Sequence, residues 1–154
     1  MLEKNHNERI SSMLNIVLLI PCLNPDQRTI THVRELINFG FSHIIIVNDG
    51  SGQEYLRFFN ELKQFKECTV LEHEVNIGKG QSLKTGLKYY VDNFDLSKMK
   101  GIVTADSDGQ HGVQDTYNVA LKLIEKEDSL VLGTRNFDEE SVPFKSKFGN
   151  KITT

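Results

Sequence analysis

The sequence predicts an α/β fold, in which helices flank a mostly parallel sheet. Short apolar runs alternate along the chain with longer segments whose apolar residues recur at helical spacing. The short runs are nearly all apolar rather than alternating, which is typical of strands buried on both faces. Strands of this kind in alternation with helices indicate a parallel sheet covered by helices on both sides, a Rossmann-like arrangement.

The first four elements follow a polar leader at residues 1–14, which we expect to be frayed. Residues 15–21, NIVLLIP, form a continuous apolar run and are predicted as a buried strand. Residues 26–40 carry apolar side chains at helical spacing and stop at a glycine, as helices commonly do. The run HIIIVND at 43–49 predicts a second strand, and residues 52–65 predict a second helix.

The second half of the chain continues the alternation. Residues 68–73, CTVLEH, predict a third strand and residues 80–94 a third helix. Residues 101–106, GIVTAD, predict a fourth strand. A helix over 113–126 and a strand over 129–134, SLVLGT, complete the series. There is no internal repeat, so we expect a single domain.

The composition fits one globular domain. A length of 154 residues allows a substantial core but is short for two domains. Hydrophobic content of 38%, charged content of 25% and only three prolines argue against a disordered chain. The formal net charge of −3 argues against a nucleic-acid binder, which usually carries a marked basic excess. An anionic small-molecule substrate is compatible with this charge, since a metal ion and local lysines can bind it.

The cysteines and the apolar runs predict the compartment. Cys22 and Cys68 match no zinc or redox spacing and each lies beside a predicted strand, so we expect buried free thiols. Free thiols suit a reducing environment. The N-terminus has no apolar signal core, and the longest apolar run, IVLLI, is far below the roughly 20 residues that span a bilayer. We therefore expect a cytoplasmic protein.

Three polar segments each follow the carboxyl end of a predicted strand: NDGSG, EVNIGKG and DSDGQH. Open parallel sheets bind ligands in the crevice outside those ends. We therefore expect the three segments to share one rim of the sheet. In the first of them, Asp49 is either part of a capped helix entry or a carboxylate that accepts hydrogen bonds from a base or ribose.

The second segment, NIGKGQSLKTG, lies just before a predicted helix. It is neither a Walker A sequence nor G-x-G-x-x-G, because Leu83 occupies the place of the last glycine. Gly78, Lys79 and Gly80 nevertheless offer backbone N–H groups and a cation to an anion. The alternative is a glycine-rich turn with a solvated lysine.

The third segment, TADSDGQH, has three interpretations. It is a plain turn, a calcium loop, or a site where carboxylates and substrate phosphates share a divalent cation. An EF-hand loop is excluded, because His111 and Tyr117 stand at its sixth and twelfth places. If the segment stays extended, Asp106 and Asp108 point the same way and can share a cation. His111 is either a further ligand or a loop residue.

Arg135 ends the last predicted strand, in LGTRNF, and its guanidinium suits phosphate. The alternative is a salt bridge with the neighbouring acidic residues 138–140. Beyond them, the stretch PFKSKFGNKITT at 143–154 starts like a basic amphipathic helix.

The order of these motifs resembles a known family. The series IPCLNPD, VNDGS, NIGKGQSLKTG, ADSDGQH, GTR and FGN, over residues 15–154, resembles the glycosyltransferase family 2 catalytic domain, of GT-A fold. Within the family, it is most similar to the polyprenyl- or dolichyl-phosphate sugar transferases. The resemblance implies inverting, metal-dependent transfer of a sugar from a UDP- or GDP-sugar to a polyprenyl or dolichyl phosphate or a cell-envelope glycan.

The resemblance also implies roles for individual residues. The cation, Mg²⁺ or Mn²⁺, would be bound by Asp108 directly, with Asp106 nearer the ribose and the metal shell. The remaining assignments are Pro21 and Asn24 in the nucleotide pocket, Asp49 on the base, Asn76, Gly78 and Lys79 along the nucleotide, Gln110 and His111 near the sugar, and Arg135 near the diphosphate or acceptor phosphate. Asp106, Asp108 and Arg135 are thus the expected catalytic residues.

The sequence departs from the family pattern in two places. The usual P-A-Y-N-E opening is replaced by PCLNPD, which displaces the acidic residue to Asp26 and puts its role in doubt. The chain also ends at Thr154, so we expect a donor-binding part that lacks the acceptor side, with its basic tail starting a segment that lies on the membrane. The alternatives are a nucleotide-sugar-binding module without turnover and a nucleotidyltransferase. Oligomeric state is left open.

Overall fold

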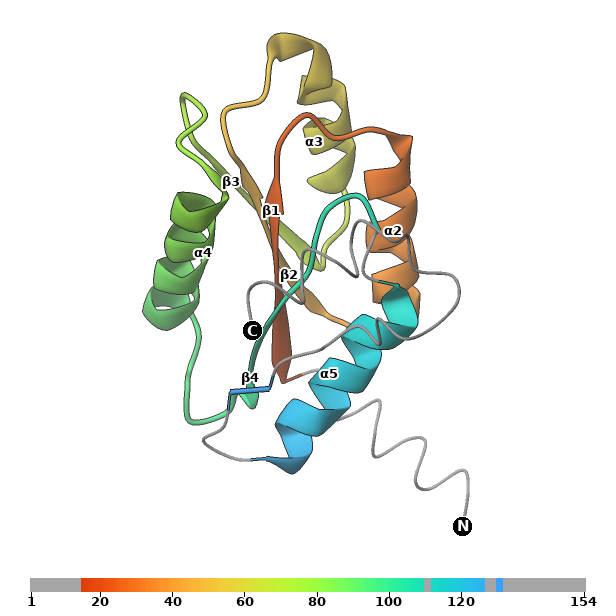
Figure 1. Ribbon diagram of the computed structural model, residues 1–154, viewed down its shortest axis with the longest axis vertical. Coiled ribbons are helices and arrows are strands. Elements are labelled where there is room, and N and C mark those ends of the chain that lie inside the picture. The colour runs from red at the N-terminus through yellow and green to blue at the C-terminus, as the bar shows by residue number, and fades with distance from the viewer. Residues whose placement is uncertain (1–14, 110–111, 127–129, 132–154) are drawn as a thin grey trace, which may run out of the picture.

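The computed structural model describes residues 15–109, 112–126 and 130–131, which form a parallel sheet with helices on both faces (Figure 1). The elements are β1 (Ile16–Cys22), α2 (Gln27–Asn38), β2 (His43–Asn48), η1 (Gln53–Tyr55), α3 (Leu56–Leu62), β3 (Cys68–Glu72), α4 (Lys79–Asn93), β4 (Gly101–Thr104) and α5 (Val113–Glu125). The predicted α/β fold is confirmed. The leader, the tail and most of the predicted strand over 129–134 lie outside the described residues.

The strand order explains where a site can form. Within the described residues, the strands lie in the order β3-β2-β1-β4, and every neighbouring pair is parallel. From β1 the chain moves outward to β2 and β3, and then returns to the other side of β1 for β4. The carboxyl ends of β1 and β4 therefore flank a topological switch point, which is where open sheets of this kind bind ligands.

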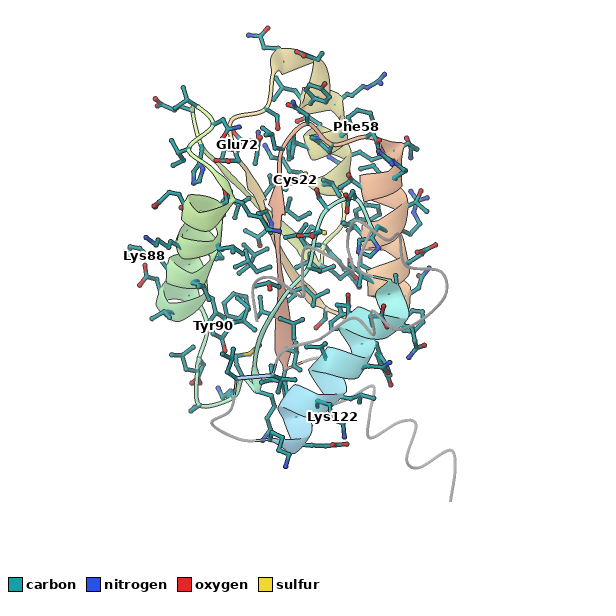
Figure 2. The ribbon with its side chains drawn as sticks, in the orientation of Figure 1. Cys22, Phe58, Glu72, Lys88, Tyr90 and Lys122 are labelled. Carbon is teal, nitrogen blue, oxygen red and sulfur yellow. The ribbon has the colours of Figure 1, made fainter. Side chains whose placement is uncertain are left out.

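The core consists of two layers, because successive side chains of a strand point to opposite faces of the sheet. Ile16, Leu18 and Ile20 pack into the larger cluster, with side chains from α2, α3 and α5. Val17 and Leu19 pack into the smaller cluster, against α4. All seven residues of β1 are buried, which confirms the prediction of a strand covered on both faces. Figure 1 shows α4 on one side of the sheet, and Figure 2 shows Lys88 on that helix pointing outward.

Helix α2 begins and ends with local hydrogen bonds that the sequence encodes. The Asp26 carboxylate accepts a hydrogen bond from the N–H of Arg28 and caps the first turn. At the other end, Gly40 N–H donates to the Ile37 carbonyl at 2.9 Å and Phe41 N–H to the Leu36 carbonyl at 3.3 Å, the two bonds of a Schellman motif. The predicted stop at this glycine is confirmed.

The helix predicted over 52–65 is shorter and begins differently. A 3₁₀ turn at Gln53–Tyr55 precedes α3, because Tyr55 N–H donates to the carbonyl of Gly52 at 3.0 Å. After Leu62 the chain tightens into a turn of the same kind, in which Phe65 N–H donates to the Leu62 carbonyl at 3.2 Å. The sequence predicted a helix here, but not the two tight turns at its ends.

The two cysteines carry free thiols. Cys22 is buried and Cys68 is half-buried against the larger cluster, so full burial is confirmed only for the first. Burial raises the pKa of the Cys22 thiol to about 11 and that of Cys68 to about 12. Neither thiol is therefore ionised near neutral pH, and neither acts as a nucleophile without a further activating group.

Candidate functional site

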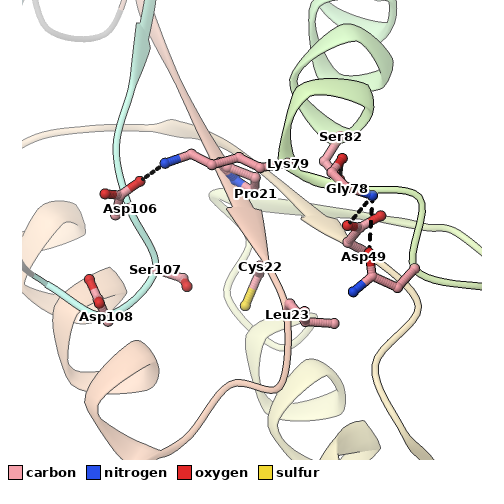
Figure 3. Close-up of a pocket in the computed structure, with 11 residues that line it drawn as sticks. Pro21, Cys22, Leu23, Asp49, Gly78, Lys79, Ser82, Asp106, Ser107 and Asp108 are labelled. Atoms are coloured by element: carbon pink, nitrogen blue, oxygen red, sulfur yellow. Dashed lines mark hydrogen bonds and ion pairs between the residues drawn. The ribbon is translucent and has the colours of Figure 1, made fainter. Parts of the chain in front are cut away.

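A cavity of about 420 Å³ opens at the carboxyl ends of β1, β2 and β4 (Figure 3). Its lining residues are Pro21, Cys22, Leu23, Asp49, Asn76, Gly78, Lys79, Ser82, Asp106, Ser107 and Asp108. They come from the end of β1 and from the three polar segments expected at this rim. The cavity lies at the switch point of the sheet.

Asp49 follows β2 and is buried, with 4% of its surface exposed. Its Oδ1 accepts a hydrogen bond from Ile77 N–H at 3.1 Å and lies 2.9 Å from His73 Nδ1. Its Oδ2 accepts a hydrogen bond from Gly78 N–H at 2.9 Å. These three groups occupy most of the roughly four lone-pair sites of a carboxylate. The Asp49 carboxylate thus lines the cavity while it accepts hydrogen bonds from neighbouring groups of the protein.

These hydrogen bonds decide the charge of Asp49. Burial is the largest single influence and by itself raises the pKa of the carboxyl, because it disfavours the charged form. Hydrogen bonds, chiefly those from His73, Ile77 and Gly78, outweigh it and hold the pKa below its ordinary value. Asp49 is therefore ionised at neutral pH.

Gly78 forms the N-cap of α4 and has a φ of 94°. Its N–H donates to Asp49 Oδ2 and to Asn76 Oδ1, at 2.9 and 3.0 Å. The expectation that this N–H is available to an anion is therefore wrong, because two side chains of the site accept from it. The helix begins one residue earlier than predicted, at Lys79.

Gly78→Ala is expected to destabilise the protein by about 1–2 kcal/mol, because alanine at this φ is strained although space is open around it. Gly80→Ala is the matched control, since Gly80 lies in the first turn of α4 with the same open surroundings. Alanine there is expected to stabilise by up to about 1 kcal/mol. Urea denaturation of both variants measures the contrast, and equal effects would contradict the assigned conformation.

The third segment does not remain extended. Strand pairing continues one residue beyond β4, where Ala105 N–H donates to the Leu19 carbonyl at 3.1 Å. Ser107 and Asp108 then form a turn. The condition under which alternation would align Asp106 with Asp108 is therefore not met, because the backbone turns between them. Both carboxylates nevertheless line the same cavity (Figure 3).

Lys79 brings a positive charge to this cavity. Its Nζ forms an ion pair with Asp106 Oδ1, so the first turn of α4 is tied to the segment after β4. The lysine side chain is 61% exposed and that of Asp106 is 29% exposed. The cation therefore remains accessible to an anionic ligand in the cavity.

Asp106 and Asp108 are the residues that suit a divalent cation. Mg²⁺ is commonly bound by one or two carboxylates together with substrate phosphates. Two carboxylates beside Lys79 in an open cavity fit that arrangement. Among the described residues there is no cluster of three or more His, Cys, Asp or Glu side chains that could hold a metal ion by itself. Substrate oxygens would have to supply the remaining ligands.

Two further expectations concern residues near the end of β1. Asn24 does not line the cavity; it is exposed, has a φ of 51°, and its N–H donates to Ser51 Oγ at 2.9 Å. Asp26, whose role was in doubt, caps α2 and pairs with Arg28 at 2.7 Å. The hydrogen bond to Asp26 raises the pKa of Arg28 and lowers that of Asp26. The contacts of Asp26 thus give it a structural role at the start of α2.

Several site residues lie elsewhere or were missed. Gln110, His111 and Arg135 lie outside the described residues. Ser82 lines the cavity because it follows the N-cap by four residues, one turn into α4, a spacing that the sequence does contain. His73 contacts Asp49 from the end of β3, and no motif in the sequence marked it.

The fold and the cavity define a class of protein, namely α/β proteins that bind a ligand outside the carboxyl ends of a parallel sheet. Comparison with known proteins identifies the family within that class. The family described as Glycosyl transferase family 2 matches residues 19–151. The chain belongs to glycosyltransferase family 2.

Three known proteins illustrate what the chain is similar to. The chain is 27% identical to an uncharacterised protein of Methanocaldococcus jannaschii, over 96% of this chain and 59% of that protein. It is 31% identical to the UDP-N-acetylglucosamine–dolichyl-phosphate N-acetylglucosaminyltransferase of Methanococcus voltae, over 88% of this chain and 59% of that protein. The chain thus spans 59% of the length of each of these relatives. Among solved structures, S. aureus TarS has a TM-score of 0.48 and 18% identity, over 61% of this chain and 16% of that one.

Proposed function

We propose that this chain carries the donor-binding part of a metal-dependent, inverting glycosyltransferase. Its donor would be a UDP- or GDP-sugar, and its acceptor a polyprenyl or dolichyl phosphate or an envelope glycan. The observation that carries the proposal is the cavity in which Lys79, Asp106 and Asp108 lie together at the switch point of the sheet. The family match, and the name of the Methanococcus voltae relative, favour a glycosyltransferase over a nucleotidyltransferase.

The cavity has distinct surroundings for the two ends of a nucleotide. Pro21 and Leu23 line it at the end of β1, and we assign the nucleoside to this part. Lys79 Nζ pairs with Asp106 in the part of the cavity that follows β4, where its positive charge favours an anion. We assign the diphosphate there.

Asp106 and Asp108 would hold Mg²⁺ or Mn²⁺ together with the diphosphate oxygens. When bound, such a cation supplies Lewis-acid stabilisation of the charge that builds on the leaving diphosphate. Lys79 contributes a second positive charge on the same side, and its pairing with Asp106 orients it before the donor binds. By family resemblance, we assign Gln110 and His111 to the sugar and Arg135 to the diphosphate or acceptor phosphate.

Transfer to a phosphate acceptor requires no removal of a proton from the acceptor. An acceptor oxygen forms a bond to the anomeric carbon while the bond from that carbon to the donor diphosphate breaks. The diphosphate leaves with the electron pair, and inversion follows from attack on the opposite face. Because a phosphate acceptor is already anionic, no general base has to remove a proton.

The proposal also concerns the cellular location of such an enzyme and its contact with the membrane. No helix within the described ranges is long and apolar enough to cross a bilayer. We place peripheral membrane contact at the basic segment 143–154, and the site itself in the cytoplasm. The free thiols of Cys22 and Cys68 support a reducing compartment.

Calorimetric titration with UDP and GDP, each with and without Mn²⁺, tests the proposal. We expect one of the two nucleotides to bind, and to bind at least about tenfold more tightly with the metal ion, since a shared cation removes the repulsion between diphosphate and carboxylates. Failure of both nucleotides to show metal-dependent binding would overturn it. Transfer of radiolabelled sugar to polyprenyl phosphate or to a glycan then tests turnover. Binding without transfer to either would support a nucleotide-sugar-binding module instead.

A further inference from the structure

His73 connects two parts of the site that are far apart in the sequence. It follows β3, and its N–H donates to the carbonyl of Asn48 at 2.9 Å, which extends the pairing of β3 with β2. Its imidazole is 10% exposed. Nδ1 lies 2.9 Å from Asp49 Oδ1, and Nε2 lies 2.9 Å from Thr85 Oγ1 on α4. The ring therefore bridges the end of β2 and the second turn of α4.

The ionised carboxylate fixes the direction of the first of these hydrogen bonds, and the second follows for a neutral ring. An ionised carboxylate only accepts, so Nδ1 carries the hydrogen that faces Asp49. In the neutral ring Nε2 then accepts, and the Thr85 hydroxyl donates to it. The tautomer of His73 is thus set by Asp49, and the orientation of the ring by Thr85.

The oriented carboxylate in turn organises the cavity wall. Asp49 accepts hydrogen bonds from the N–H groups of Ile77 and Gly78, and Gly78 is the N-cap from which α4 begins. The next residue, Lys79, reaches across to Asp106. A continuous set of contacts therefore runs from the imidazole of His73 to the ammonium group of Lys79. Figure 3 shows the contacts of Asp49 with Gly78 and of Lys79 with Asp106.

We propose that His73 and Thr85 are positioning residues of the donor site, which orient the Asp49 carboxylate so that it holds the Ile77–Gly78 backbone and with it Lys79. Asp49 in this assignment organises the phosphate side of the cavity instead of reading the nucleotide base. The inference rests on the proposed function, because it concerns the binding of a diphosphate at that site.

The experiment compares variants that keep or remove single hydrogen bonds. His73→Leu removes both ring contacts, whereas His73→Asn keeps an N–H donor close to the place of Nδ1. Thr85→Val removes the hydroxyl with little change of shape, and Thr85→Ser is its matched control. Circular dichroism verifies that each variant is folded. If His73→Leu fails to fold, the Thr85 pair still tests the proposal.

Two probes separate the phosphate side from the base side of the cavity. These are the tighter-binding nucleoside diphosphate and inorganic pyrophosphate, each with Mn²⁺. We expect His73→Leu and Thr85→Val to weaken both probes about tenfold, the factor expected for loss of one hydrogen bond in a charged network. His73→Asn and Thr85→Ser should recover most of that loss. If nucleotide binding falls while pyrophosphate binding is unchanged, Asp49 reads the base and the proposal is overturned. Equal losses in His73→Asn and His73→Leu, or no loss in any variant, would also overturn it.

Hydrogen exchange tests the positioning without any ligand. The amides of Ile77 and Gly78 should be protected in the wild type, and should exchange faster in His73→Leu and Thr85→Val than in the two conservative variants. Unchanged protection in all four variants would overturn the role of His73. If the wild type binds neither probe, the proposed function fails, while this exchange experiment still decides whether His73 positions the loop.

Discussion

Gly50→Ala is expected to destabilise the protein by about 2–5 kcal/mol, the sum of backbone strain at positive φ and overlap in a packed region. Gly50 has a φ of 71°. A Cβ at this position would overlap the backbone of Val75 and Asn76, with Val75 Cα only 2.6 Å away. Backbone atoms cannot rotate away as a side-chain tip can, so the two segments would have to separate.

Gly52→Ala is the matched control for this prediction. Gly52 lies two residues further along and has a φ of −61°, and the atoms nearest to a Cβ there belong to the flexible carboxylate of Glu54. Its expected effect is below about 1 kcal/mol, as for an ordinary surface substitution. Urea denaturation curves give both values. A loss below about 1 kcal/mol for Gly50→Ala would mean that the segments after β2 and β3 are not packed as described.

This contact matters because it places Asp49 beside the segment that it holds. Gly50 follows Asp49 directly, and the backbone of Val75 and Asn76 lies against it. The N–H groups of the next two residues then fall within reach of the Asp49 carboxylate. A larger side chain at position 50 would therefore affect the cavity as well as stability. Nucleotide binding by any folded Gly50→Ala protein should be weaker than that of Gly52→Ala.

The sequence predicted the sheet and its rim because those features depend on local patterns. The continuous apolar run at 15–21 requires burial on both faces, and β1 is buried throughout. The glycine that ends the helix predicted at 26–40 is likewise a local signal, since the Schellman bonds involve only neighbouring residues. The alternation of strands and helices then determined the parallel topology, and with it the side of the sheet on which ligands bind.

The hydrogen bonds within the site could not be predicted, because they join residues that lie far apart in the sequence. Asp49 lies 24 positions from His73, and His73 lies 12 positions from Thr85. A lone histidine after a strand carries no signal of such partners. The turn at Ser107 and Asp108 replaces the extended backbone that strand alternation assumes, although Asp-Gly in DSDG is itself a turn signal. Asn24 does not line the cavity in which the resemblance places it, and its N–H donates to Ser51 Oγ, a contact 27 positions away along the chain.

Asp108→Ala is expected to weaken the metal-dependent binding of a nucleoside diphosphate by about 100-fold or more. Residues that merely support a metal ligand typically change affinity 10–100-fold, so loss of a direct carboxylate ligand should reach the upper end of that range. Asp106→Ala should cost less, because it releases Lys79 from its ion pair and leaves that cation to the diphosphate. The order of the two effects follows from this pairing.

Asp92→Ala supplies the control for removal of one negative charge. Asp92 lies on α4 with a half-exposed side chain paired to Lys88 at 2.7 Å, and it does not line the cavity. Titration calorimetry with and without Mn²⁺ should show wild-type affinity for this variant. The metal-free affinity of Asp108→Ala should equal or exceed that of the wild type, since removal of a carboxylate lowers the repulsion of the diphosphate. A loss of equal size with and without the metal ion would show that Asp108 acts on the nucleotide directly and would refute its assignment as a metal ligand.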